Sequence, residues 1–417
     1  MYLTTTGIRP RRRGGAAAPW RQVGGNVLAL GAVSLTTDVS SEMVTAVLPL
    51  YLVAGLHLGP AAYGLLDGLY GGATVLLRLA GGYLADRTRR RKATAGLGYG
   101  LSAAARLGLL AAGASTAGLA LAVTADRAGK GLRTAPRDAL IGLSVPPAVL
   151  GRAFGVHRAM DAVGAFTGPL VALAVLAAAD QAFDAVFLTS FCVACFGVLL
   201  LALFVRDHRD RPGPRSTAAP RAREAAALLG RPAVRRLLGA ACLLGLATVG
   251  DGFVYLLLQR RTALATGWFP LLAVGTALAY LLLAAPLGAL ADRIGRTPVL
   301  LAGYLAVAAG YLLLAGPLGG PPLVLAVLLL HGLFYAATDG VLMALATPVL
   351  PERLRTTGLA LVQSGQALAY LASSALFGLA WQTWGVPAAA TGAAVTAVLA
   401  AAATAVLLGR RGGQGEA

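Results

Sequence analysis

The feature that most constrains this chain is a succession of apolar stretches, each long enough to cross a bilayer. A membrane-spanning helix needs roughly 20 mostly apolar residues. Hydrophobic residues make up 57% of the 417 residues and charged residues only 12%, about half the charged fraction of a typical soluble domain. We predict an all-α membrane protein with about 12 transmembrane helices. They lie near residues 27–53, 61–84, 93–113, 117–142, 150–178, 185–205, 237–258, 268–290, 298–317, 322–347, 357–380 and 385–408.

The basic residues between these stretches predict the orientation of the chain. The termini and alternate connections hold 26 Lys and Arg, whereas the intervening connections hold only Arg260 and Arg261. Cytoplasmic loops carry the excess of Lys and Arg, so we expect a multi-pass protein of the inner cell membrane with both termini in the cytoplasm. The net charge of +18 then reflects topology. No basic helix, zinc motif or aromatic-rich basic sheet points to nucleic acid.

The longest internal connection divides the chain into two halves. Residues 206–236 are rich in Arg, Pro and Ala, and we expect this linker to lie on the inner surface, drawn to anionic lipid. The predicted organisation is a basic cytoplasmic tail (1–24), a six-helix half (25–205), the linker (206–236), a second six-helix half (237–409) and a cytoplasmic tail (410–417). One chain with two halves makes a monomer sufficient. Repeated halves, with the substrate site between them, are common in transporters.

Matching loops in the two halves carry a family resemblance. The first copy consists of Gly82, Asp86, Arg87 and Arg90, and the second of Gly288, Asp292, Arg293 and Arg296, in the sequences GGYLADRTRRRK and PLGALADRIGRT. Both resemble the signature loop of the major facilitator superfamily, although Arg89 replaces a usual Gly in the first copy. A carboxylate at such a helix end can pair with Arg or with a helix N-terminus of the other half. We therefore expect these loops to gate the cytoplasmic side. The alternative is that they are solvated loops that only set topology.

Two helix motifs extend the resemblance over nearly the whole chain. Arg127-x-x-x-Gly131 resembles the superfamily's fourth-helix motif. Gly155, Gly164, Gly168 and Pro169 resemble its antiporter motif, although the usual closing Gly pair is replaced here. The runs TTDVSSEMVTAVLPLYL and DRAGKGLRTAPRDAL are similar to a bacterial branch of drug and metabolite transporters. The resemblance implies a secondary active transporter that works by alternating access, with protons as the expected coupling ion.

The charged residues inside the spans are the candidate functional groups. Each costs roughly 2.5–3.5 kcal/mol on insertion scales, so such groups normally face a cavity or a partner. The resemblance implies that the first and fourth helices line a central cavity, which would surround it with Asp38, Glu42, Arg127 and Lys130. Our hypothesis is that Asp38, close to Arg127, carries a proton in exchange for substrate, with Glu42 as the alternative carrier. The competing interpretation is a permanent ion-pair network that only joins helices.

Other intramembrane charges have less defined roles. Arg133, Arg137 and Arg158, with Asp161, lie nearer the cytoplasm and are expected either to gate or to bind an anionic substrate. We expect Asp67, Arg78 and Arg106 to hold helices together, and His157 to pair with Asp161. No metal-ligand cluster, cofactor motif or catalytic set is present in the sequence, so we expect neither an enzyme nor a cofactor.

These patterns favour proton-driven efflux of a small organic molecule. The alternative is transport of an anionic metabolite, in either direction, that uses the basic residues of the fourth helix. A non-transporting membrane sensor on the same fold is disfavoured, because sensors usually add a soluble output domain and the linker is too short for one.

Overall fold

The computed structural model describes residues 24–72, 90–146, 149–207, 227–338, 341–351 and 354–409, and within these ranges it contains helices and no strand. The first half comprises α1 (Gly25–Leu50), the π-turn η2 (Tyr51–Gly55), a helix at 60–72, α3 (Arg91–Ala111), α4 (Thr116–Leu143), α5 (Leu150–Ala178) and α6 (Phe183–Phe204). The second half comprises α8 (Pro232–Leu246), α9 (Asp251–Thr262), η4 (Thr266–Trp268), α10 (Pro270–Ile294), α11 (Arg296–Ala315), α12 (Gly320–Thr338), α13 (Val341–Ala346), η5 (Thr347–Val349) and α14 (Arg355–Gly409).

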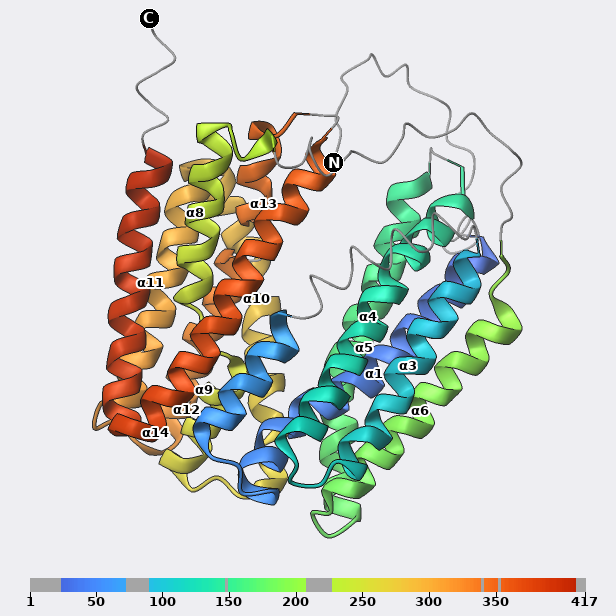
Figure 1. Cartoon of the computed structure of the whole chain (residues 1–417), viewed down its shortest axis with the longest axis horizontal. Helices are drawn as coiled ribbons and strands as arrows, with labels where there is room; N and C mark the ends of the chain where they lie inside the picture. Colours follow the sequence, from blue (N-terminus) through green and yellow to red (C-terminus); the bar gives the residue numbers. More distant parts are fainter. Residues whose placement is uncertain are drawn as a thin grey trace, which may run out of the picture.

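The two halves form separate bundles that lean together at one end. Figure 1 shows most of the first half on the right and the second half on the left, close together at the bottom and apart toward the top, with the helix at 60–72 (blue) beside the second half. The lower end holds η2 and the α9–α10 connection, which are predicted outer segments. The upper end holds the start of α1 and the end of α10, which are predicted cytoplasmic segments. The side that is closed is therefore the predicted outer side.

Local sequence explains where several helices begin, end and bend. Ser115 precedes α4, and its Oγ accepts a hydrogen bond from the Gly118 N–H at 3.2 Å, which satisfies one free donor of the first turn. Gly385 interrupts α14 with φ of 81°, a conformation that glycine adopts without strain. The break falls at the first residue of the stretch predicted at 385–408, directly after the stretch predicted at 357–380, so α14 contains both.

The stretch predicted at 237–258 is not one continuous helix. The chain leaves helical geometry after Leu246 and resumes it at Asp251. In this break the Val249 N–H donates to Tyr311 Oη of α11 at 2.9 Å, which replaces a helical hydrogen bond that would otherwise be lost in an apolar setting. The predicted span is present, because residues 232–262 are long and apolar enough to cross a membrane, but the helix within it is interrupted. Hydropathy reports apolar character and gives no information on backbone continuity.

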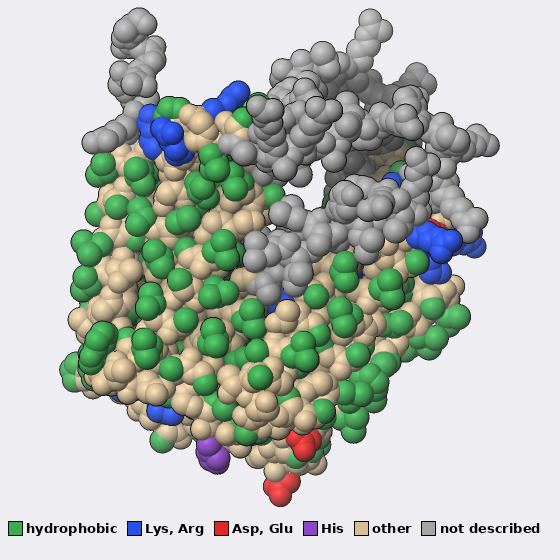
Figure 2. All heavy atoms as spheres, in the orientation of Figure 1, with side chains coloured by type: hydrophobic (Ala, Val, Ile, Leu, Met, Phe, Trp, Pro, Cys, Tyr) green, Lys and Arg blue, Asp and Glu red, His purple; other side chains and the backbone are tan. Residues whose placement is uncertain are grey.

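The surface has the composition expected of a membrane protein. Figure 2 shows hydrophobic side chains spread broadly over the described part of the visible face, with Lys and Arg gathered mainly near its upper rim. Leu121 and Trp384 are about three-quarters exposed, at 73% and 74%. Eight helices in the described part of the chain are long and apolar enough to cross a membrane. The count of twelve spans stays a prediction. The eight helices include α14 as one, although two spans are predicted there, and they do not include the charged helices α3 and α4.

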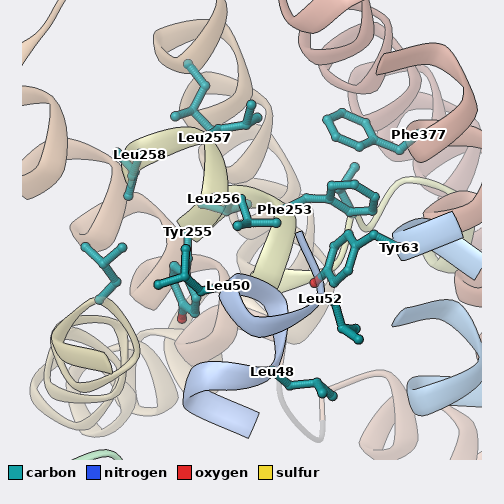
Figure 3. Packing of buried hydrophobic residues seen from close by; sticks show 14 of the residues in the cluster. Leu48, Leu50, Leu52, Tyr63, Phe253, Tyr255, Leu256, Leu257, Leu258 and Phe377 are labelled. Carbon is teal, nitrogen blue, oxygen red and sulfur yellow. The ribbon is translucent and has the colours of Figure 1, made fainter. Parts of the chain in front are cut away.

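The core runs without interruption from one half into the other at the closed end. Tyr63 packs on Phe253 of α9 with ring centroids 4.7 Å apart, and Phe253 packs on Phe377 of α14 at 4.8 Å. Leu50 and Leu52 from the end of the first span belong to the same buried cluster. Figure 3 shows Tyr63 against Phe253, with Leu50 and Leu52 close by. This packing forms the floor of the space between the halves.

Candidate functional site: a cavity between the halves

A cavity of about 1060 Å³ lies between the halves. Its walls come from α1, the helix at 60–72 and α5 on one side, and from α9, α10, α12 and α14 on the other. Cavities that hold small organic ligands measure roughly 300–1,000 Å³. This one is therefore large enough for a drug-sized molecule.

The polar lining of this cavity is acidic and phenolic. Three carboxylates line it: Glu42 from α1, Asp67 from the helix at 60–72, and Asp251 from the start of α9. Six tyrosines line it with them: Tyr63, Tyr70, Tyr255, Tyr280, Tyr335 and Tyr370. No Lys or Arg lines it in the part of the chain that the structure describes. Such a surface attracts positive charge, through the carboxylates and through the faces of the aromatic rings.

Glu42 faces the cavity because α1 and α5 approach each other very closely. A Cβ added at Gly168 of α5 would lie 2.6 Å from Glu42 Cβ, and one at Gly164 would lie 2.6 Å from the Leu35 carbonyl oxygen. Only glycine fits such spacing between helix backbones. The predicted antiporter-like motif therefore packs on the face of α1 that carries Asp38 and Glu42. Its Pro169 lines the cavity. Gly155, the first residue of the motif, has no such neighbour.

Asp38 lies behind this surface. Its Oδ1 is 3.8 Å from Arg133 Nη2 of α4, and Asp38 is not among the residues that line the cavity. The cation nearest to Asp38 is thus Arg133, where the sequence led us to expect Arg127. Arg133 is itself 3% exposed and lies over the Tyr99 ring, 4.7 Å from its centroid.

Arg127 takes part in a buried cluster that joins α1, α3, α4 and the helix at 60–72. It pairs with Asp126, the residue before it, and lies 3.7 Å from the centroid of the Tyr70 ring. Asp126 also pairs with Arg106 of α3, and Arg106 donates to Ser41 Oγ of α1 at 2.9 Å. Arg106, Asp126 and Arg127 are each at most 7% exposed. Asp126 thus offsets part of the positive charge that α3 and α4 carry inside the protein.

The remaining basic candidates lie toward the predicted cytoplasmic side. Arg137 donates to Ser34 Oγ at 3.0 Å and pairs with Asp138 at 2.9 Å, and its Nη1 is 4.0 Å from Asp161 Oδ2. His157 Nε2 is 3.7 Å from the same Asp161 oxygen. Separately, Arg158 is exposed, and Lys130 forms no ion pair within 4.0 Å with another described side chain.

The second half supplies a carboxylate whose position in the cavity the sequence did not reveal. Asp251 accepts a hydrogen bond from Tyr335 Oη at 2.6 Å, and its Oδ1 is 3.0 Å from His331 Nε2. Both partners come from α12. The glycines that flank Asp251 in the sequence VGDG were a visible signal of the break in the helix. Hydropathy alone gave that signal no weight.

The two signature loops are described only in part. Gly82, Asp86 and Arg87 lie outside the described residues, whereas Arg90 is exposed and directly precedes α3. In the second copy Gly288, Asp292, Arg293 and Arg296 are exposed at the junction of α10 and α11. Gly295, with φ of 95°, makes the turn between these helices.

Comparison with known proteins identifies the family. The sequence model of the Major Facilitator Superfamily matches residues 30–271 and 260–416. An uncharacterized MFS-type transporter of Methanocaldococcus jannaschii is 29% identical over 374 residues, which cover 87% of this chain and 90% of that protein. An uncharacterized protein of Mycobacterium tuberculosis is 36% identical over 168 residues, 40% of either chain.

Solved structures agree on the fold. A mutant of the nucleoside transporter NupG superposes with a TM-score of 0.79 at 13% identity, covering 91% of this chain and 99% of that one. The peptide transporter POT in complex with sulfate gives 0.75 at 15% identity, covering 95% and 99%. At such identities the likeness concerns the fold alone. Sequence and fold together show that this chain belongs to the major facilitator superfamily and is a multi-pass membrane transporter.

Proposed function

We propose that the protein expels a small organic cation in exchange for protons, by alternating access of the cavity between its halves. The observation that carries this proposal is the lining of that cavity by Glu42, Asp67 and Asp251 with no basic side chain among the described residues. Carboxylates inside a membrane are costly and are kept where they bind ions, protons or substrates. A site with this charge favours a cation over an anion.

Glu42 is the proposed proton carrier. It lines the cavity, so a proton or a cationic substrate can reach its carboxylate. Asp38 is the first residue that the sequence suggested for this role, but it lies beside Arg133 and outside the lining. We assign Asp38, with Arg133, to the support behind the site. Competition between proton and cation for one carboxylate would couple the two fluxes, because each would displace the other.

The rival function, transport of an anionic metabolite, would need basic side chains in the site. Arg133 and Arg137 are largely buried beside Asp38 and Asp138. Lys130 is the basic residue of α4 without an ion pair to a described side chain, and it is not part of the cavity lining. These contacts favour cation transport and leave the anion as an outcome for experiment.

The surroundings of the transporter follow from its charge pattern. We propose an inner-membrane monomer with both termini and the linker 206–236 in the cytoplasm, the linker lying against anionic lipid. The basic loops around Asp86 and Asp292 would close the cytoplasmic side when the outer side opens. The glycine motif of α5 supports antiport, because it fixes α5 against the face of α1 that carries Glu42.

The test is proton-coupled flux in inverted membrane vesicles. An imposed pH gradient should drive uptake of a lipophilic dye cation, and a protonophore should abolish it. Glu42→Gln removes the proposed proton carrier and should reduce the uptake at least about tenfold, since a positioned proton-transfer group contributes about 10²–10⁴-fold in enzymes. The matched control is Asp180→Asn, an exposed carboxylate outside the cavity, which should transport like the wild type.

Other outcomes would change the assignment. Loss of transport in Asp38→Asn, with Glu42→Gln still active, would move the proton to Asp38. Flux of a small organic anion that ignores both substitutions would refute the cation proposal and direct attention to Lys130, Arg133 and Arg137.

A further inference from the structure

Asp67 joins the two halves as well as lining the cavity. Tyr370 Oη donates to Asp67 Oδ2 at 3.0 Å, and Ser374 Oγ donates to the same oxygen at 2.6 Å. Both donors lie in α14 of the second half, whereas Asp67 belongs to the first. The other carboxylate oxygen accepts a longer hydrogen bond, 3.3 Å, from Tyr63 of its own helix. One buried carboxylate is therefore shared between the two halves.

The backbone around Asp67 is built for this contact. A Cβ added at Gly68 would lie 2.7 Å from the Leu371 carbonyl oxygen, and one added at Gly64 would collide with the carbonyl oxygen of Ser374. The helix at 60–72 thus lies directly on the backbone of α14. Closer to the predicted outer surface the Ala61 N–H donates to Gln382 Oε1 at 3.2 Å. Asp67 stands about two turns deeper along the same seam.

A third element of the second half meets the same carboxylate. A Cβ added at Gly250 would collide with the Asp67 carboxylate. Gly250 is the last residue of the break between α8 and α9, with φ of −59° and ψ of 141°, angles that any residue can adopt. The requirement for glycine here is therefore set by space and not by backbone conformation. The carboxylate occupies the place where a side chain would stand.

We propose that Asp67, Tyr370 and Ser374 form a latch that holds the halves together on the predicted outer side, and that this latch must open each time the cavity turns outward. The inference rests on the alternating access of the proposed function. It gives Asp67 a role in the conformational cycle that is separate from the proton carrier Glu42. The carboxylate lies both in the seam and in the cavity wall, so breaking the latch opens the cavity floor.

The experiment measures conformation directly, so that it does not depend on flux. Cys192, Cys195 and Cys242 are first replaced, and spin-label pairs are placed across the halves. One pair, Asp184→Cys with Thr383→Cys, reports on the predicted outer side. The other, Asp207→Cys with Arg231→Cys, reports on the predicted cytoplasmic side. All four positions are exposed. Distance distributions are recorded by pulsed electron paramagnetic resonance in lipid nanodiscs.

Asp67→Ala should lengthen the outer-side distances and shorten the cytoplasmic-side distances. Each hydrogen bond to a charged group changes an equilibrium by roughly ten- to a hundredfold, so the outward-open population should rise at least about tenfold. Ser374→Ala and Tyr370→Phe should shift it in the same direction by less. These two variants also test the latch if Asp67→Ala does not fold. Adding Ser374→Ala to Asp67→Ala should have little further effect, because the acceptor is already gone.

Two further variants sharpen the test. Gly250→Ala leaves the chemistry of Asp67 intact but pushes its carboxylate away, and it should shift the same two distances. Asp180→Asn removes an exposed carboxylate outside the seam and should leave both distributions unchanged. Unchanged distributions in Asp67→Ala, Ser374→Ala and Gly250→Ala would overturn the latch. A clear shift in these variants, together with a wild-type protein that transports no cation, would keep the latch and refute the proposed function.

Discussion

The buried charges of α4 make a quantitative prediction about stability. Asp126 is the shared counter-ion of Arg106 and Arg127, and all three side chains are nearly inaccessible. Asp126→Asn leaves two buried guanidinium groups without a carboxylate. Removing one partner from a buried ion pair costs about 3–5 kcal/mol. For a cooperative unit of 150–250 residues, which is the size of the first half, each kcal/mol lowers Tm by roughly 2–4 °C. We therefore expect a loss of roughly 6–20 °C.

Thermal unfolding in a mild detergent, followed by far-ultraviolet circular dichroism and by size-exclusion recovery, measures this loss. The matched control is Asp138→Asn. Asp138 also pairs with the neighbouring arginine of α4, but its side chain is 39% exposed, and partly solvated pairs contribute about 0–1 kcal/mol. The Asp138→Asn substitution should therefore change Tm by no more than a few degrees.

A double substitution separates charge from shape. Arg106→Met removes one of the two cations, so adding it to Asp126→Asn should recover part of the lost stability. The reasoning is refuted if Asp126→Asn unfolds within the error of the wild type, or if the double variant is destabilised by the full sum of the single effects.

Three further predictions follow from the packing and the cavity. Gly168→Leu should abolish dye transport, because its Cβ would stand 2.8 Å from a carbonyl oxygen of α1, whereas Gly155→Ala, which meets nothing within 4 Å, should transport normally in the same vesicle assay. Gly385→Ala should lower stability by about 1–3 kcal/mol, the cost of combining a positive φ with an extended ψ in a residue with a Cβ, with Tm as the readout. Tyr335→Phe removes the shorter of the two hydrogen bonds to Asp251 and should change the apparent affinity for the cation more than the maximal rate, as separated by an uptake titration.

Hydropathy and loop charge were enough to predict the helical membrane fold and the division into halves. They work because lipid imposes the same requirement of about 20 apolar residues on every span. The break at residues 247–250 escaped them, because it depends on Tyr311 of a different helix. A partner 62 positions away along the chain leaves no trace in a local apolar count.

The candidate site was only partly predictable, for two physical reasons. Helical spacing predicts Asp38 and Glu42 on one face, but it could not tell which of them reaches the cavity, where only Glu42 of the two is found. Arg127 instead folds back onto the adjacent Asp126. Neighbouring residues on a helix point in different directions, so a helical wheel did not indicate this pair. The contacts of Asp67 with Tyr370 and Ser374 span 303 and 307 residues. Only the folded arrangement of the halves brings them together.

The crowded charges of α4 also bear on how this protein enters the membrane. At roughly 2.5–3.5 kcal/mol for each charged side chain, α4 cannot partition into lipid as a lone helix. Its partners stand on α3, where Arg106 pairs with Asp126, and on α1, where Ser34 accepts a hydrogen bond from Arg137 and Asp38 lies beside Arg133. Both helices are synthesised before α4. We expect α4 to stay at the translocon until those helices have gathered beside it. The first half then enters the bilayer as an assembled group, and the order of synthesis becomes part of what makes the fold attainable.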